Sequence, residues 1–237
     1  MRVLAFVVTL AAGILSAAPW TLRSFFYPKP AGLPPVVAKS MEELLPRLQA
    51  ALEKRAPEVV KLLQPGLTTE EIAGLEGRGG FKLSPDLRAL YRWRNGMLAH
   101  GNAGLLPGRR FLPLGEVVRE RTLIAGQVAA QDWYHRLMFS IFAGHRRSWV
   151  TIIDDGSGDG YFYDPERTEA AGAFFYNMSE TRDYLWFPSL RNFLAGATEC
   201  YETGAIKPAK SGGELEEDYV RTRKILERFG LSREPTP

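Results

Sequence analysis

The stretch that most constrains the fold is residues 149–165, WVTIIDDGSGDGYFYDP. A β-branched run, Val150–Ile153, and an aromatic run, Tyr161–Tyr163, are joined there by a connection rich in glycine and aspartate. Two strand-forming runs joined in this way predict a β-hairpin. Glycine reaches unusual backbone dihedrals and aspartate hydrogen-bonds its own backbone, so the connection predicts a tight turn shaped by Gly156, Gly158 and Gly160. We expect this hairpin to be central to the fold.

The same connection has a second interpretation, a calcium loop. Asp155, Ser157, Asp159 and Glu166 follow the ligand order of an EF-hand, with glycine at the sixth place and glutamate at the twelfth. The flanks fit poorly, because an EF-hand loop joins two helices, whereas strands are predicted here and Pro165 precedes the glutamate. The turn is therefore the preferred interpretation, calcium is the alternative, and no cofactor is predicted.

Composition excludes several classes of protein. Lys and Arg number 30 against 27 Asp and Glu, which gives a net charge of only +3 and no sign of the basic face of a nucleic-acid binder. The single cysteine, Cys200, excludes an internal disulfide. A length of 237 residues with 45% hydrophobic content suits one domain with extensions, or two small domains.

The N-terminus resembles a targeting segment. A basic start is followed by an apolar run from Val3 to Leu15 and by small residues up to Ala18. Residues 1–18 therefore predict a signal peptide or, if uncleaved, a membrane tether through residues 3–18, and 19–39 form a proline-rich spacer. Export or membrane anchoring in the cell envelope is the expectation, and a cytoplasmic location is the alternative.

Three helix starts stand out in the first half of the folded part. Capping-box patterns begin at Ser40 and Thr68, and Ser84 precedes a proline at the first helical position. Pro57 is expected to break or kink the first helix, and Asn95-Gly96 to end the third, since both residues tolerate a left-handed backbone.

The second half mixes strands and helices. Helices are predicted over 115–127, 190–203 and 214–230, and strands over 109–114 and 172–177, with a polar linker at 207–213. Residues 133–145 fit either a helix or strands.

Four motifs in order give the chain a resemblance to the SUKH superfamily, which includes the Smi–Knr regulators of cell-wall assembly. They are T69-E-E-I with L75-E, the run from L83-S-P-D-L to W93-R-N-G, L112-P-L with the hairpin, and S189-L-R-N-F-L. The resemblance covers about 66–206 within a predicted domain at 40–206. It implies an α+β fold, with a single mainly antiparallel sheet and packing helices, and no catalytic residues.

Nucleophilic or zinc chemistry finds little support in the sequence. Cys200 falls at an inward position of the helix at 190–203, and the three histidines, His100, His135 and His145, lie in no nucleophile motif and lack metal-ligand spacing. A small buried hydrophobe is the preferred interpretation of Cys200, and the chain is not expected to be an enzyme.

The resemblance implies protein binding, as in bacterial immunity proteins that neutralise a toxin domain, so the expected partner is a protein such as a cognate toxin. A regulatory adaptor in envelope assembly is the alternative, and a calcium-binding or enzymatic protein is a further one. The expected contact surface combines the hairpin carboxylates with two tryptophans: Asp154, Asp155, Asp159, Trp133 and Trp186. The sequence does not determine the oligomeric state.

Overall fold

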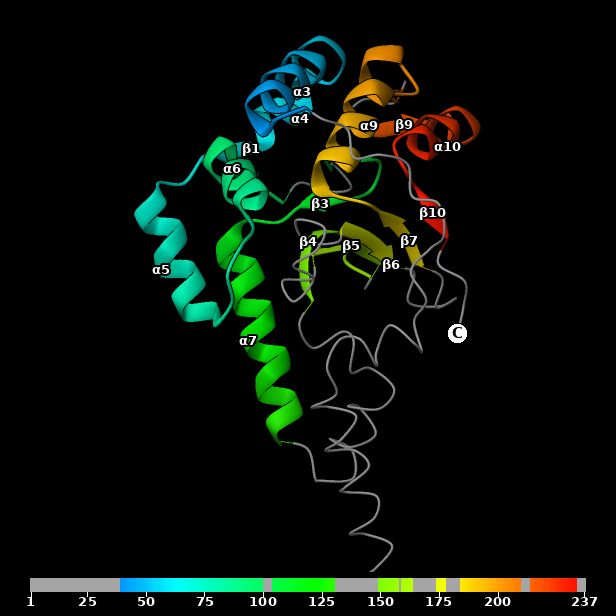
Figure 1. Cartoon of the computed structure of the whole chain (residues 1–237). Coiled ribbons are helices and arrows are strands. Elements are labelled where there is room, and N and C mark those ends of the chain that lie inside the picture. The colour runs from blue at the N-terminus through cyan, green and yellow to red at the C-terminus, as the bar shows by residue number, and fades with distance from the viewer. Residues whose placement is uncertain are drawn as a thin grey trace, which may run out of the picture.

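The computed structural model describes residues 39–99, 104–130, 149–157, 159–163, 174–177, 184–209 and 214–233. The predicted hairpin is present, as β4 (Val150–Asp154) and β5 (Gly160–Tyr163), at the centre of a six-stranded sheet (Figure 1). The strand order is β10-β7-β6-β5-β4-β3, and every neighbouring pair is antiparallel. The other strands are β3 (Arg110–Phe111), β6 (Phe174–Asn177), β7 (Tyr184–Phe187) and β10 (Ser232–Arg233). The α+β class is confirmed.

Two smaller sheets accompany the main one. β1 (Leu63–Pro65) pairs with β2 (Arg94–Met97), and β8 (Ile206–Pro208) pairs with β9 (Leu215–Glu217), both antiparallel. The predicted linker at 207–213 therefore begins inside a strand. The helix predicted over 214–230 is shorter, because α10 spans Tyr219–Arg228 behind β9.

The helices begin at the residues whose side chains suit a helix start. They are α3 (Met41–Arg55), α4 (Pro57–Leu62), α5 (Thr69–Gly79), α6 (Pro85–Trp93), α7 (Leu114–Ala130) and α9 (Leu190–Thr203). Thr68 forms the predicted capping box with Glu71, and Ser84 Oγ accepts the Leu87 N–H at 3.2 Å. Ser40 precedes α3 without a capping bond from its side chain, so the predicted capping box is absent there although the helix forms.

The Asn-Gly pair has a different role from the one predicted. α6 already ends at Trp93, and the pair lies inside β2. Asn95 Oδ1 accepts the N–H of Leu114 at 3.0 Å and so satisfies a free donor at the start of α7. Gly96 has a φ of 72°, and a Cβ there would lie 2.3 Å from Pro113 N. The pair therefore fastens β2 to α7 and does not end α6.

Helix α9 lies between the sheet and the outer helices α3 and α10 (Figure 1). On the sheet side, the Phe193 ring packs against Tyr161 and Phe187, with centroids 4.7 and 5.4 Å apart. On the outer side, Arg47 of α3 holds Glu202 of α9 with two hydrogen bonds. The core is thus organised around α9.

Some predictions concern residues outside the described part. These are the segments 1–18 and 19–38, Trp133, Gly158, Glu166 and the three histidines, while Trp186 is described by its backbone alone. Within the described residues, none of the helices combines the length and the apolar character that crossing a membrane requires.

Candidate functional site

The hairpin turn is built around one carboxylate. Asp155 Oδ1 accepts hydrogen bonds from Ser157 N at 2.8 Å, Ser157 Oγ at 2.9 Å and Asp159 N at 3.2 Å. Partial burial tends to raise the pKa of Asp155, but the bonds from Ser157 and Asp159 outweigh it and the pKa is lowered. Asp155 therefore shapes the turn as an ionised acceptor.

Two turn glycines have distinct backbone roles. Gly156 has a φ of 78°, in the left-handed region that favours glycine. A Cβ at Gly160 would lie 2.3 Å from the carbonyl oxygen of Ile153, so only glycine allows this approach of β5 to β4. These positions agree with the predicted turn. Strands flank it, and within the described residues no group of three or more His, Cys, Asp or Glu is placed to hold a metal.

A second set of carboxylates lies beside the turn. Asp154 ends β4, and burial together with repulsion from Asp155 and Glu116 raises its pKa, against the opposing effect of Arg110. Burial and repulsion from Asp154 and Glu116 likewise raise the pKa of Glu120 on α7, although Thr151 donates a hydrogen bond to it. Glu116 and Glu120 were not predicted as site residues. Their spacing of four on one helix face was the available signal.

Two arginines lie among these carboxylates, and one of them, Arg109, also acts on β9. Arg110 forms an ion pair with Glu116, with Nη2 2.6 Å from Oε2. The charge of Arg109 acts on both Asp155 and Glu217 of β9, and burial raises the pKa of Glu217 against that attraction. We define the acidic surface as the carboxylates joined by these interactions, from α7 across the end of β4 to β9: Glu116, Glu120, Asp154, Asp155 and Glu217.

Cys200 is a structural residue. Its side chain is fully buried in α9, as the inward position predicted, and burial raises its pKa to about 12. A thiol with that pKa is protonated at neutral pH and is a poor nucleophile.

One small cavity lies between α4 and the β8–β9 hairpin. Its volume is about 100 Å³, and Val59, Pro208 and Leu215 are among its lining residues. Sites for small molecules and cofactors usually enclose about 300–1,000 Å³. This cavity is therefore too small for a typical cofactor.

A family model described as the SMI1 / KNR4 family (SUKH-1) matches residues 66–196, more than half of the 237 residues. The chain belongs to the SMI1/KNR4 (SUKH-1) family. The resemblance predicted from the four motifs is thereby confirmed. The sequence matches no curated protein.

The SUKH motif residues hold the fold together. Asp86, from L83-S-P-D-L, accepts two hydrogen bonds of 2.8 Å from Arg191, in S189-L-R-N-F-L, which ties α6 to α9. Asn192 of the same motif donates its side-chain N–H to Phe229 O at 3.0 Å and so ties α9 to the end of α10. These residues are occupied by structural contacts. The acidic surface, which contains none of these residues, is the better candidate for a partner contact.

Proposed function

We propose that this SUKH domain is a non-enzymatic binding module that recognises a protein partner, in the manner of the immunity proteins that neutralise a toxin domain. The observation that carries the proposal is the family match over residues 66–196. The buried, protonated thiol of Cys200 supports a binding role, since the only cysteine of the chain is unsuited to nucleophilic catalysis.

The contact surface that we propose is the acidic surface with the hairpin tip. Asp154, Asp155 and Asp159 belong to the hairpin, and Glu116 and Glu120 extend it onto α7. Carboxylates that repel one another in a half-buried setting gain when cations approach. A partner with a basic face therefore fits this surface. Trp133 and Trp186 remain part of the proposed contact as aromatic anchors.

A location in the cell envelope is part of the proposal. The apolar run at residues 3–18 supports it, because a binding protein must meet its partner in the same compartment. Cell fractionation with an antibody to the folded domain tests the location. Recovery of the full-length chain in the cytosol alone would contradict it.

Affinity capture tests the binding function. The purified full chain is immobilised, and captured proteins are identified by mass spectrometry and then re-purified for titration. We expect one basic protein to be enriched and its binding to weaken at least about tenfold in the variant Glu120→Lys/Glu217→Lys. The variant Glu53→Lys/Glu58→Lys on α3 and α4 makes the same charge change elsewhere and should bind normally. No enriched protein, or catalytic turnover of any captured one, would overturn the proposal.

A further inference from the structure

The outer face of α10 carries features that the fold does not need. Its inner face is packed, because Thr222 and Ile225 are buried, and Gly196 of α9 approaches so closely that a Cβ there would lie 2.9 Å from a methyl carbon of Leu226. Arg228 also forms an ion pair with Glu199 of α9. The helix is thus held on the core by its inner face.

Two large apolar side chains in the first turn of α10 are exposed. Tyr219 is 66% exposed and Val220 is 64% exposed, and they are the only consecutive pair among the exposed large hydrophobics of the described residues. Arg223, four residues further along the helix, is close enough to Tyr219 for the phenol to raise its pKa, and it is paired with Glu227 at 2.8 Å. Tyr219 is thus an exposed aromatic side chain of the kind that serves as a binding anchor.

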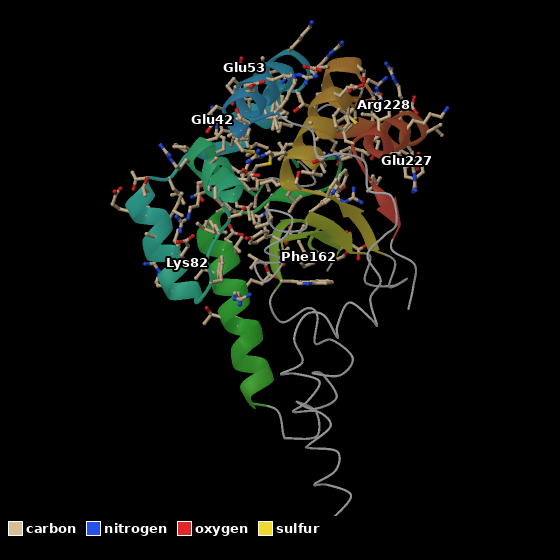
Figure 2. All side chains as sticks on the ribbon, in the orientation of Figure 1. Glu42, Glu53, Lys82, Phe162, Glu227 and Arg228 are labelled. Atoms are coloured by element: carbon tan, nitrogen blue, oxygen red, sulfur yellow. The ribbon has the colours of Figure 1, made fainter. Side chains whose placement is uncertain are left out.

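Two cations border this pair. Arg221 and Lys224 are exposed, three residues apart on one helix face, and neither side chain has an ion-pair partner within the part of the chain that the structure describes. The other two cations of α10, Arg223 and Arg228, are used in ion pairs (Figure 2 labels Glu227 and Arg228). The exposed face of α10 thus combines an aromatic and an aliphatic group with two available positive charges.

The position of Arg221 runs against helix electrostatics. The N-terminal end of a helix carries a partial positive charge and favours acidic residues in its first turn. α10 has no acidic residue in that turn and has Arg221 there instead, behind the N-cap Asp218. Local rules broken without a structural gain are expected at functional positions, and an acidic partner would offset the unfavourable charge.

We propose that Tyr219, Val220, Arg221 and Lys224 form a second contact surface, the α10 face, which binds an acidic segment of a protein partner that also carries an apolar side chain. Glu217 of the acidic surface lies only two residues before Tyr219, so the two surfaces adjoin. A single partner with a basic patch and an acidic patch fits both. The inference rests on the proposed function in assuming a protein partner.

A lipid surface fits these features less well. The apolar residues that α10 and its C-cap would insert into a bilayer, Ile225, Leu226 and Phe229, are packed in the core or against it. Only two cations remain available, fewer than the clusters of about 4–8 that mark anionic-lipid binding. Binding to a protein surface requires fewer cations, because a few anchor residues can provide most of the affinity.

The test compares two charge-reversal variants of the full chain. Arg221→Glu/Lys224→Glu changes the α10 face, and Lys54→Glu/Arg92→Glu makes the same change at exposed positions of α3 and α6. Acidic residues suit the start of α10, so the first variant should keep the wild-type melting temperature or exceed it. A loss of binding in this variant could then not be explained by unfolding.

Fluorescence anisotropy with a labelled peptide of glutamate and leucine is the first measurement. We expect salt-sensitive binding that weakens about tenfold in Arg221→Glu/Lys224→Glu and less than about twofold in the control. The variant Tyr219→Ser, which keeps every charge, should also weaken it. No binding by the wild type, or equal loss in both charge variants, would overturn the proposal.

Two further measurements distinguish an acidic protein segment from a lipid surface and from a second copy of the chain. Stronger retention on vesicles containing phosphatidylserine than on the peptide, lost in Arg221→Glu/Lys224→Glu, would replace the protein partner with a lipid surface. Self-association in sedimentation velocity that the same variant abolishes would replace it with a second copy of the chain. A captured partner that binds this variant normally would overturn the α10 face and leave the proposed function intact, whereas failure to capture any partner would count against the proposed function.

Discussion

Glu76 is a charged side chain enclosed between α5 and α6. Its carboxylate is 0% exposed, accepts the Leu83 N–H at 2.8 Å, and receives two hydrogen bonds from Arg88, at 2.9 and 2.7 Å. Burial alone would raise the pKa of Glu76, but the bonds from Arg88 and Leu83 outweigh it and lower the pKa below its usual 4.5. The ion pair therefore stabilises the folded chain only while the carboxylate is ionised.

We expect Glu76→Gln to lower the free energy of unfolding by about 2 kcal/mol at pH 7, because it replaces the charge-assisted hydrogen bonds from Leu83 and Arg88 with weaker neutral ones, while the 44% exposed Arg88 remains solvated. The control Glu58→Gln removes an exposed pair with Lys61 and should change it by less than about 0.5 kcal/mol. Since the folded pKa is lowered, the contribution of Glu76 is present above pH 4.5 and is lost as the pH falls through the folded pKa. Urea unfolding at several pH values measures both effects, and equal losses in the two variants would contradict this role.

Alanine substitutions at Gly96 and Gly80 would distinguish the cost of backbone strain from the cost of a steric clash. Their φ angles are 72° and 65°, but a Cβ at Gly96 would lie 2.3 Å from Pro113 N, whereas one at Gly80 would meet nothing within 4 Å. Gly80→Ala should therefore cost about 1 kcal/mol from strain alone. Gly96→Ala should cost more than about 3 kcal/mol, because β2 must move away from α7. Thermal melts of both variants compare them, and similar losses would show that β2 accommodates the methyl group.

At the scale of elements, the sequence predicts the helices whose boundaries are marked by single residues. Thr68, Ser84 and Pro57 mark helix boundaries through their own side chains, and the structure places boundaries there. The missed strands have two to four residues each and depend on a partner strand; they are β1, β2, β7, β8, β9 and β10. Tyr219 of α10 is exposed because the buried residues of that helix are Thr222 and Ile225.

Helix α10 shields the only cysteine of the chain, which makes its docking measurable. Cys200 is fully buried, and Thr222 of α10 lies close enough to influence the pKa of its thiol. A chain ending at residue 213 should expose the thiol and raise its rate of reaction with a disulfide reagent by about tenfold or more. A chain ending at residue 233 retains α10 and β10 and should react as slowly as the full chain. Equal rates in the two chains would show that α10 does not protect α9.

At the scale of the whole molecule, the carboxylates divide into two groups with opposite effects on stability. Those in ion pairs or turns, Glu76, Asp155 and Glu202, have lowered pKa values. Three carboxylates of the acidic surface, Glu120, Asp154 and Glu217, have raised values, so Asp155 is the member of that surface that belongs to the lowered group. The hairpin part of this surface was visible in the sequence. Its other members come from α7 and β9, and only folding brings them to the hairpin, so no local pattern predicted the whole.

The carboxylates with raised pKa values determine how stability changes between neutral and mildly acidic pH. A carboxyl group whose folded pKa lies above its unfolded value binds a proton more tightly in the folded state, so stability rises as the pH falls through the interval between those values. Further acidification protonates the carboxylates with lowered pKa values and removes their contribution to the free energy of unfolding. We therefore expect a maximum of thermal stability at mildly acidic pH, and not at pH 7.

The variant Glu120→Gln/Asp154→Asn tests this and links stability to binding. Neutral amides remove the repulsion and the penalty for burying charge, so the melting temperature at pH 7 should rise by about 3 °C and the rise of stability on mild acidification should flatten. A protein that retains such unfavourable carboxylates sacrifices stability for function, so the same variant should bind the captured basic partner more weakly. Melts from pH 4 to 8, with a titration at pH 7, measure both. A variant that is more stable yet binds as tightly as the wild type would remove the acidic surface from the proposed contact.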